Sequence, residues 1–413
     1  MSRADGTGTR TEQAERAEGS AGPVVAAGTG WAEWADRRNA KARARGRWRE
    51  LRDLDALGLH GRLADGREVT VFAANDYLGL SAHTAVVEAA EKALKRWGAG
   101  AGAARLLSGS RPVHRELEER LAAWKGTESA LLFPSGYSTN IGVLSALAAP
   151  QVQICSDSLN HASIIDGCRL ASASGAKVEV YPHSDVQRVE ALLEAWRGRS
   201  VVVTDSVFSM DGDAAPVAEL AASCARHGAL LVLDEAHAVL GPQFGRLPCE
   251  LLRVGTLSKT LGSQGGFVAG TRPMVELLVN WCRPFIFTTA LAPSSAAAAL
   301  AALGIVTSSE GTALLAQLES NVRRLRAELE PPTLGAPGGA SVSPIIPFVI
   351  GSENEALEAS NALLQSGLFV PAVRPPTVPP GTSRLRVALS AAHTDDEVDQ
   401  LCQALGELGL MTT

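Results

Sequence analysis

A lysine set among small hydroxyl residues is the first candidate for chemistry in this sequence. Lys259 stands between Ser258 and Thr260 in the stretch G-T-L-S-K-T-L-G-S-Q-G-G, residues 255–266. Small neighbours leave the backbone open to a ligand, and hydroxyl groups can donate to phosphate oxygens. A lysine amine held there is placed to form an imine with an aldehyde cofactor. Taken alone, however, the stretch is more typical of a surface turn with a solvated lysine.

An acidic motif upstream favours the imine. The run L-L-V-L-D-E-A-H places Asp234 at the end of an apolar strand, 25 residues before Lys259, and His237 three residues further on. A carboxylate that faces a pyridine nitrogen keeps this nitrogen protonated, and the ring then withdraws electrons strongly. His237 follows closely enough to reach the phenolic oxygen of the same ring.

The D-E-A-H run is also found in nucleic-acid-dependent ATPases. Such an enzyme needs a phosphate loop, G-x-x-x-x-G-K-[ST], earlier in the chain. The sequence contains no such loop, and Lys259 lies downstream without a glycine immediately before it. The net charge of −6 also offers no basic excess for nucleic acid. We therefore reject the ATPase interpretation and expect no nucleic-acid partner.

Other candidate residues follow other predicted strands, where open α/β sheets bind ligands. F-P-S-G-Y brings Gly136 and Tyr137 to the start of a helix, whose free N–H groups can cradle a phosphate. N-H-A-S carries His161, and the acidic loop T-D-S-V-F-S-M-D-G-D carries Ser209. That loop lacks the ligand spacing of a calcium site, so we expect no metal. The glycine-rich run 98–104 fits a dinucleotide fingerprint, but a helix precedes it where the fingerprint needs a strand.

Composition excludes several other classes of protein. The six cysteines are scattered without a C-x-x-C pair, which favours reduced thiols in a cytoplasmic protein. No apolar run reaches the roughly 18 residues of a membrane span. The Ala-rich stretch 290–306 comes nearest, but Pro293 interrupts it. Residues 1–30 show no apolar signal segment, and we expect a disordered tail there.

The body of the chain predicts an α/β fold. Near-continuous apolar runs are typical of a mostly parallel sheet that is covered on both faces. We expect seven central strands, at 130–133, 152–155, 177–181, 200–204, 229–233, 253–257 and 266–269. We expect helices at 85–97, 115–124, 138–148, 184–197, 216–227, 310–329, 355–365 and 395–408. Shorter strands are expected at 69–73, 345–350, 368–373 and 385–389.

The same pattern predicts a division into domains. We expect a helical N-terminal segment at 31–74, with a helix or two before Leu59. A large cofactor-binding domain would span 75–308. A smaller α+β domain would span 309–413, after a Pro/Gly break at 331–339.

At this point the order of the motifs resembles one family, the α-oxoamine synthases. The resemblance covers about residues 45 to 410. It implies a pyridoxal-phosphate enzyme of the aspartate-aminotransferase fold, fold type I. The motifs that carry it are N-D-Y-L-G-L (75–80), S-G-Y (135–137), N-H-A-S (160–163), D-S-V-F-S-M-D-G-D (205–213), D-E-A-H (234–237) and G-T-L-S-K-T-L-G (255–262).

The resemblance implies roles for the residues that match. Lys259 would hold pyridoxal 5'-phosphate as an imine and would act in catalysis together with His161. Two subunits would share each active site in a homodimer, with Thr288 or Thr289 reaching the cofactor phosphate of the partner. His161 would also stack on the cofactor ring. The remaining cofactor contacts would be Gly136, Tyr137, Ser209, Asp234, His237 and Thr256, and the substrate contacts would be Arg49, Thr377 and Arg386.

The C-terminal motifs R-P-P-T-V-P (374–379) and S-R-L-R-V-A-L-S-A-A-H-T (383–394) narrow the implied activity. They are most similar to members that condense L-alanine with pimeloyl-coenzyme A, or a pimeloyl carrier protein, to 8-amino-7-oxononanoate in biotin synthesis. The alternatives are a sister enzyme that uses glycine, of the 2-amino-3-ketobutyrate ligase or 5-aminolevulinate synthase type, and a non-catalytic partner subunit. The chain departs from the family after His237, where a Thr-Gly is missing and the segment to Lys259 is short. It also departs at Ala104, where relatives often carry serine.

Overall fold

The computed structural model describes residues 30–240, 245–329 and 343–411. The chain divides into two compact units, residues 1–50 and 51–413. In the first unit, helix α1 (Trp31–Ala44) buries none of its side chains, and Trp31 and Trp34 meet edge to face. The tail expected before Gly30 and the Pro/Gly break at 331–339 lie outside the described residues.

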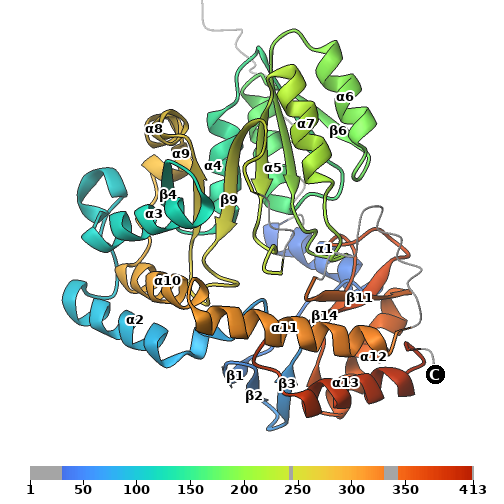
Figure 1. The fold of residues 1–413 in the computed structure, drawn as a ribbon. Coiled ribbons are helices and arrows are strands. Elements are labelled where there is room, and N and C mark those ends of the chain that lie inside the picture. Colours follow the sequence, from blue (N-terminus) through green and yellow to red (C-terminus); the bar gives the residue numbers. More distant parts are fainter. Residues whose placement is uncertain (1–29, 241–244, 330–342, 412–413) are drawn as a thin grey trace, which may run out of the picture. The chain divides into compact units, whose positions relative to one another are not determined.

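A seven-stranded sheet forms the centre of the second unit (Figure 1). The strand order is β4-β10-β9-β8-β7-β5-β6, and β10 alone runs antiparallel to its two neighbours. The predicted mostly parallel sheet of seven strands is thus confirmed. The strands are β4 (Ser129–Phe133), β5 (Val152–Asp157), β6 (Lys177–Tyr181), β7 (Arg199–Asp205), β8 (Leu230–Asp234), β9 (Glu250–Thr256) and β10 (Gly266–Gly270).

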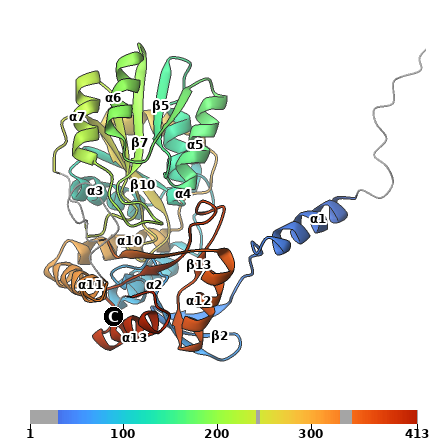
Figure 2. The ribbon, with the colours of Figure 1, turned by 90° about the vertical axis from the view of Figure 1, so that its right-hand side faces the viewer.

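Helices cover both faces of this sheet, because its strands are apolar on both sides (Figure 2). Val201 and Val203 of β7 pack in one core cluster, whereas Val202 between them packs in another on the opposite face. Helices α4, α5 and α8 cover the first face; α6 and α7 cover part of the second, and α3 and α10 cover the rest. The helices are α2 (Thr84–Trp97), α3 (Pro112–Lys125), α4 (Gly136–Ala146), α5 (Ala162–Ala173), α6 (Val186–Ala195), α7 (Val217–His227), α8 (Arg272–Trp281), α9 (Arg283–Ile286) and α10 (Pro293–Val306).

Two small sheets and three helices make up the remainder of the unit. The first sheet, β1-β2-β3-β12, joins the N-terminal strands to the C-terminal part of the chain, since β12 pairs in parallel with β3. The second sheet has the order β11-β14-β13. The elements are β1 (Leu54–Leu57), β2 (His60–Leu63), β3 (Glu68–Val71), α11 (Ser309–Ala327), β11 (Ile345–Gly351), α12 (Glu353–Gln365), β12 (Leu368–Phe369), β13 (Ala372–Val373), β14 (Ser383–Ala388) and α13 (Asp395–Glu407).

Two local predictions are wrong. The helical pattern expected up to Leu59 ends at Ala44, and residues 54–63 form a hairpin instead. Gly58 adopts a left-handed φ of 64° there, which a two-residue hairpin turn requires. The single strand expected at 368–373 is divided between two sheets. Pro371 lies between the halves, and its missing N–H cannot continue a ladder.

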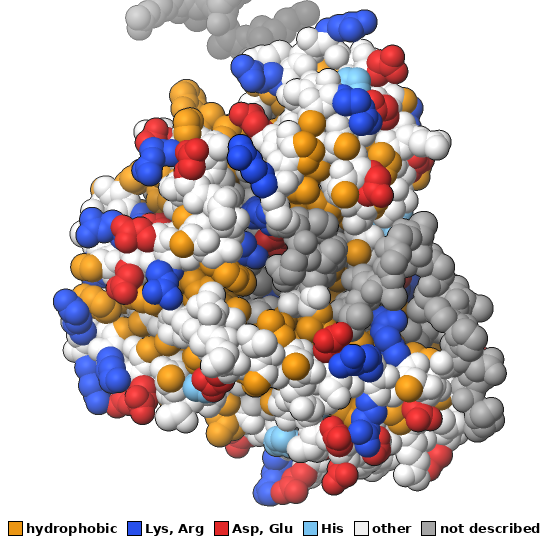
Figure 3. Space-filling view, viewed as in Figure 1, with side chains coloured by type: hydrophobic (Ala, Val, Ile, Leu, Met, Phe, Trp, Pro, Cys, Tyr) orange, Lys and Arg blue, Asp and Glu red, His pale blue; other side chains and the backbone are white. Residues whose placement is uncertain are grey.

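Most of the Ala-rich stretch 290–306 forms the buried helix α10, which the sequence pattern did not predict. In the described part of the chain, no single helix is long and apolar enough to cross a membrane. Helices α10 and α11 are long and apolar enough for a span only when they are taken together, and the pair is bent by 80°. Over the described residues on the face shown in Figure 3, acidic and basic side chains are interspersed.

Candidate active site

Lys259 lies in a closed turn between β9 and β10. The amide N–H of Leu257 donates to the carbonyl oxygen of Gly265 at 2.9 Å, which ties the ends of the turn together. Gly262 has a φ of 54°, and a Cβ there would lie 2.4 Å from the backbone nitrogen of Ser81. Lys259 itself is half-buried. Burial lowers the pKa of Lys259 to about 8, against the opposing effect of nearby carboxylates.

His237 contacts Lys259 directly. Its Nε2 lies 2.6 Å from Lys259 Nζ, and its Nδ1 lies 2.6 Å from the hydroxyl of Tyr77. Only 5% of His237 is exposed. Burial, and then the positive charge of Lys259, hold the pKa of His237 well below its ordinary value. The imidazole is therefore neutral, with one N–H to donate.

Asp234 ends β8 beside this pair, as its sequence position predicts. One carboxylate oxygen accepts a hydrogen bond from Asn140 Nδ2 at 2.6 Å, and the other accepts from the Ala236 N–H at 2.9 Å. Only 5% of Asp234 is exposed. Asn140 belongs to α4, and its Oδ1 has no hydrogen-bond partner among the described residues. The side-chain amide of Asn140 thus holds the buried Asp234 carboxylate in place in the site.

His161 lies at the N terminus of α5, next to a second buried carboxylate. Its backbone N–H donates to Asp205 Oδ2 at 2.7 Å, and Asp205 lies opposite Asp234 in the parallel pairing of β7 with β8. The His161 ring meets the Tyr137 ring edge to face, with centroids 6.2 Å apart. Desolvation by the surrounding protein lowers the pKa of His161, although the charge of Asp234 opposes it. Burial, reinforced by Asp234, raises the pKa of Asp205 well above its ordinary value.

The N terminus of α4 meets the ends of β9 and β10. A Cβ on Gly136 would lie 3.3 Å from Thr256 Cβ, and one on Gly266 would lie 2.5 Å from the Gly136 nitrogen. The Thr256 hydroxyl contacts Ser258 Oγ at 2.7 Å and donates to the Gly265 carbonyl oxygen at 3.0 Å. Unpaired N–H groups at a helix start, flanked by hydroxyls, suit an anion such as phosphate.

Arg386 approaches the same centre from β14. Its Nε donates to the Ser209 carbonyl oxygen at 2.5 Å, and a terminal nitrogen donates to Asn75 Oδ1 at 3.1 Å. Asn75 Oδ1 also lies 3.1 Å from the Tyr77 hydroxyl, within hydrogen-bond distance. One polar network therefore connects Arg386 with Lys259 through Asn75, Tyr77 and His237.

The structure thus brings together most of the residues that the sequence predicted, but some remain apart from the network. Tyr137 touches the His161 ring while its hydroxyl donates to Asp166 on the surface. Thr377 is exposed, and its N–H donates to the Arg374 carbonyl oxygen. Arg49 belongs to the unit of residues 1–50 and stays a prediction. In the described part of the chain, no group of three or more His, Cys, Asp or Glu side chains is arranged to hold a metal ion.

Sequence reasoning missed four members of the cluster: Asn75, Tyr77, Asn140 and Asp205. Asn75 and Tyr77 belong to the N-D-Y-L-G-L motif, and Asp205 opens the loop that carries Ser209. Asn140 stands four residues after Gly136, which places both on one face of α4. This spacing could have pointed to Asn140, and the pairing of β7 with β8 could have pointed to Asp205.

Comparisons with known proteins show which family and which solved structures the chain is similar to. The family model of aminotransferase class I and II matches residues 67–405. A protein named 8-amino-7-oxononanoate synthase from Anaeromyxobacter dehalogenans is 49% identical over 383 residues, covering 86% of this chain and 93% of that protein. Its solved namesake from Francisella tularensis is 26% identical, with a TM-score of 0.65 over 82% of this chain and 96% of that one.

A solved serine palmitoyltransferase variant from S. paucimobilis, with a bound aldimine of pyridoxal phosphate and myriocin, is 29% identical. Its TM-score is 0.81, over 92% of this chain and 98% of that one. These neighbours confirm the predicted aspartate-aminotransferase-like fold. The chain therefore belongs to the aminotransferase class I and II family, as an enzyme of the acyltransferase type represented by these relatives.

Proposed function

We propose that this chain is a pyridoxal-phosphate enzyme that condenses L-alanine with a pimeloyl thioester. The products would be 8-amino-7-oxononanoate, carbon dioxide and the free thiol of coenzyme A or of a carrier protein. The names of relatives at 49% identity support the reaction. The single structural observation behind it is the half-buried amine of Lys259, with a pKa near 8, beside His237 and the Asp234 carboxylate.

The residues present fit pyridoxal phosphate. The two glycines at the start of α4 and of β10 leave room where Cβ atoms would collide, next to free N–H groups for the phosphate. Asp234 offers a buried carboxylate to the pyridine nitrogen, and His237 and Ser209 would serve the phenolic oxygen. The bound cofactor would supply an electron sink for the negative charge that forms at the substrate Cα.

Side chains of this protein would bind the substrate and transfer the protons. The Arg386 guanidinium would bind the alanine carboxylate with two N–H groups, a geometry that suits arginine better than lysine. Lys259 Nζ, once freed, would take the Cα proton and later return one. In between, Cα forms a C–C bond to the acyl carbon, the C–S bond breaks, and the carboxylate leaves as carbon dioxide. His161 would donate a hydrogen bond to that carboxylate.

The proposal extends to assembly and location. We propose a homodimer in which Thr288 or Thr289 reaches the cofactor phosphate of the partner subunit. The cytoplasmic location also remains a proposal, which the six free cysteines support.

A substitution of Lys259 tests the cofactor assignment. Lys259→Ala should lose both the visible absorbance of the bound cofactor and all turnover, because no other amine occupies this position. Lys95→Ala, on the exposed side of α2, is the matched control and should keep both. A Lys259→Ala protein that retains the absorbance and the activity would disprove the assignment. A wild-type protein that never acquires the absorbance would instead favour a non-catalytic subunit.

A product assay separates the substrates. Purified protein is incubated with alanine or glycine, each with short-chain, pimeloyl and long-chain acyl-coenzyme A, and the aminoketones are identified by mass. Alanine with the pimeloyl donor should give the highest kcat/KM. A preference for glycine would assign the chain to one of the sister enzymes.

A further inference from the structure

We propose that Tyr77 is a positioning residue that fixes the tautomer of His237. In this arrangement the Tyr77 hydroxyl donates to Nδ1, which places the imidazole proton on Nε2. His237 then presents an N–H to whatever acceptor occupies the centre of the site. The identity of that acceptor as the ring oxygen of the cofactor rests on the proposed function, whereas the tautomer itself rests on the protein alone.

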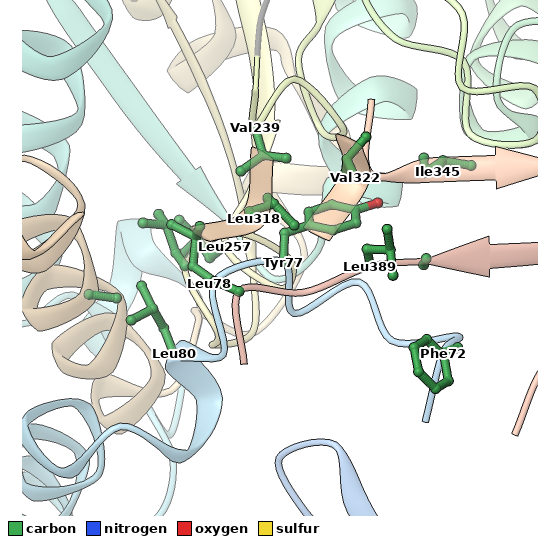
Figure 4. Packing of buried hydrophobic residues seen from close by; sticks show 14 of the residues in the cluster. Phe72, Tyr77, Leu78, Leu80, Val239, Leu257, Leu318, Val322, Ile345 and Leu389 are labelled. Atoms are coloured by element: carbon green, nitrogen blue, oxygen red, sulfur yellow. The ribbon is translucent and has the colours of Figure 1, made fainter. Parts of the chain in front are cut away.

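Packing holds the Tyr77 ring in one place. The side chain is fully buried, and Figure 4 shows it among apolar residues that include Leu257 and Val239. Leu257 directly follows the strand that leads to Lys259, and Val239 follows His237 by two residues. The Tyr77 and His237 rings meet edge to face, with centroids 6.1 Å apart. The hydroxyl is therefore presented to His237 by the same core that positions His237 and Lys259.

The hydrogen bonds around the two rings decide the direction of donation. Desolvation raises the pKa of Tyr77 to about 12, so the phenol keeps its proton. His237 is neutral for the reasons given above, and so it carries one N–H. The Tyr77 hydroxyl has two neighbours that can accept, His237 Nδ1 at 2.6 Å and Asn75 Oδ1 at 3.1 Å. Asn75 Oδ1 already accepts from Arg386, so the nearer Nδ1 is the better acceptor.

The charges around the site favour the same arrangement. The positive charges of Lys259 and Arg386, and His161, disfavour a proton on both nitrogens of His237. The carboxylates of Asp234 and Asp205 act on Lys259 and favour its charged form. In the structure Nε2 lies 2.6 Å from Lys259 Nζ, which can accept its proton once Lys259 is neutral. Under the proposed function a phenolate oxygen of the cofactor would take this position, and such an oxygen can only accept. In the opposite tautomer, two lone pairs would face each other there. Among the described residues, Tyr77 is the one hydrogen-bond partner of Nδ1, so its removal would leave the tautomer undetermined.

Nitrogen NMR of the cofactor-free protein tests the tautomer directly. The imidazole nitrogens are labelled with ¹⁵N, and the His237 signals are assigned by their loss in His237→Asn. At about pH 9, where Lys259 is mostly uncharged, the wild-type protein should show an unprotonated Nδ1 and a protonated Nε2. A proton on Nδ1 would overturn the proposal, whatever cofactor the protein binds.

A variant tests the consequence in the loaded protein. Tyr77→Phe keeps the ring volume and removes only the hydroxyl. A donor at the ring oxygen withdraws charge that otherwise stabilises the imine proton, so losing it should raise the pH midpoint of the visible absorbance change by about one unit. Tyr181→Phe is the matched control: this tyrosine is equally buried but belongs to a different core cluster at the end of β6, and its midpoint should equal that of wild type.

A double-mutant comparison separates positioning from simple destabilisation. In a His237→Asn background, Tyr77→Phe should no longer move the midpoint. If the shift persists there, or if Tyr77→Phe leaves the midpoint of the otherwise wild-type protein unchanged, the proposal is wrong. If the protein shows no visible absorbance at all, the proposed function fails, and the NMR result still decides the tautomer.

Discussion

At the scale of single residues, the ionisation of Lys259 controls how the site captures an aldehyde. Burial lowers its pKa to about 8, and the carboxylates of Asp234 and Asp205 limit the fall. An unpaired lysine in water has a pKa of about 10.4. Because the neutral amine is the nucleophile, Lys259 is largely ready to react at a pH at which a surface lysine is still protonated.

The rate of cofactor capture should therefore show this lowered pKa. Cofactor-free protein is mixed with pyridoxal phosphate between about pH 6 and pH 10, and the rise of visible absorbance is timed. The rate should climb with pH and level off above the pKa of Lys259, near 8. Nα-acetyl-lysine, whose free amine has a pKa of about 10.4, is measured at the same concentrations, and its rate per neutral amine corrects for the titration of the cofactor itself. A corrected rate that still rises steeply above pH 9, about tenfold per unit, would contradict the burial argument.

At the scale of elements, glycines decide how closely α4 approaches the sheet. A Cβ on Gly266 would lie 2.5 Å from both the Gly136 nitrogen and Thr139 Oγ1, where backbone would have to move. Gly266→Ala should cost roughly 1–3 kcal/mol of stability and weaken binding of the cofactor phosphate. Gly304→Ala is the control, because it meets open space in α10 and should stabilise by about 0.5–1 kcal/mol. Urea unfolding measures the stability of each variant, and a cofactor titration measures its affinity for the cofactor. If Gly266→Ala and Gly304→Ala have the same stability and affinity, the close-approach argument is wrong.

A second element-scale prediction concerns His183, which ties three strand-end loops together. Its Nδ1 contacts Asp157 at 3.0 Å, and its Nε2 contacts Asp213, at the end of the Ser209 loop, at 2.7 Å. Burial disfavours the charged ring, but the two carboxylates outweigh it and raise the pKa of His183 to about 10. Because the folded pKa lies above the ordinary 6.5, the stabilisation is complete below about pH 6.5 and fades as the pH rises through 10.

His183→Asn should accordingly unfold more easily at low pH than at high pH, relative to wild type. We expect a loss on the order of 2–4 kcal/mol at pH 6 and little difference above pH 10. His227→Asn, which removes a contact to Glu190 near the surface, should cost no more than about 1 kcal/mol at either pH. Denaturant unfolding at the two pH values measures these losses of stability. A loss of stability in His183→Asn that does not depend on pH would contradict the ion-pair explanation.

Some residues of the candidate site could be predicted from the sequence, and others could not. Asp234, His161 and Lys259 each follow a strong apolar strand, and parallel strands bring such ends to one edge. The proximity of Tyr77 and Arg386 has no local signal, because they lie 309 positions apart in the chain and meet only through tertiary packing. The expected role of Arg386 rests on the family resemblance and not on periodicity, and Tyr77 was missed.

The missed elements have physical reasons as well. Helix α10 is apolar on all sides because it is buried, so it lacks the one-sided periodicity by which helices are recognised. The hairpin 54–63 has no strand signal in the sequence because its strands are only four residues long and its exposed residues include the apolar Leu57, so polar and apolar positions do not alternate. Short strands depend on pairing partners, and β3 and β12, which continue this sheet, are separated by about 300 residues.

At the scale of the whole molecule, exposed apolar residues support the proposed homodimer. Leu107, Trp281 and Phe287 are 81%, 72% and 70% exposed. They lie in neighbouring segments, since the turn Arg105–Gly109 contacts α9, and Phe287 directly precedes Thr288 and Thr289. Large apolar side chains gathered on a surface are typical of an interface. The mass in solution should therefore be twice 43.0 kDa, and Trp281→Glu with Phe287→Glu should lower it to that of a monomer.

Hybrid dimers test whether the subunits share their sites. Lys259→Ala alone should be inactive, and Thr288→Ala with Thr289→Ala should bind the cofactor weakly. When the two inactive proteins are mixed and allowed to exchange subunits, half of the dimers are hybrids. Each hybrid has one complete site, with Lys259 from one subunit and the threonines from the other. Activity should return to about a quarter of the wild-type value per subunit. If each subunit builds its site alone, mixing restores nothing. Native mass spectrometry of the same samples, with one of the two proteins labelled with ¹⁵N, shows whether exchange took place.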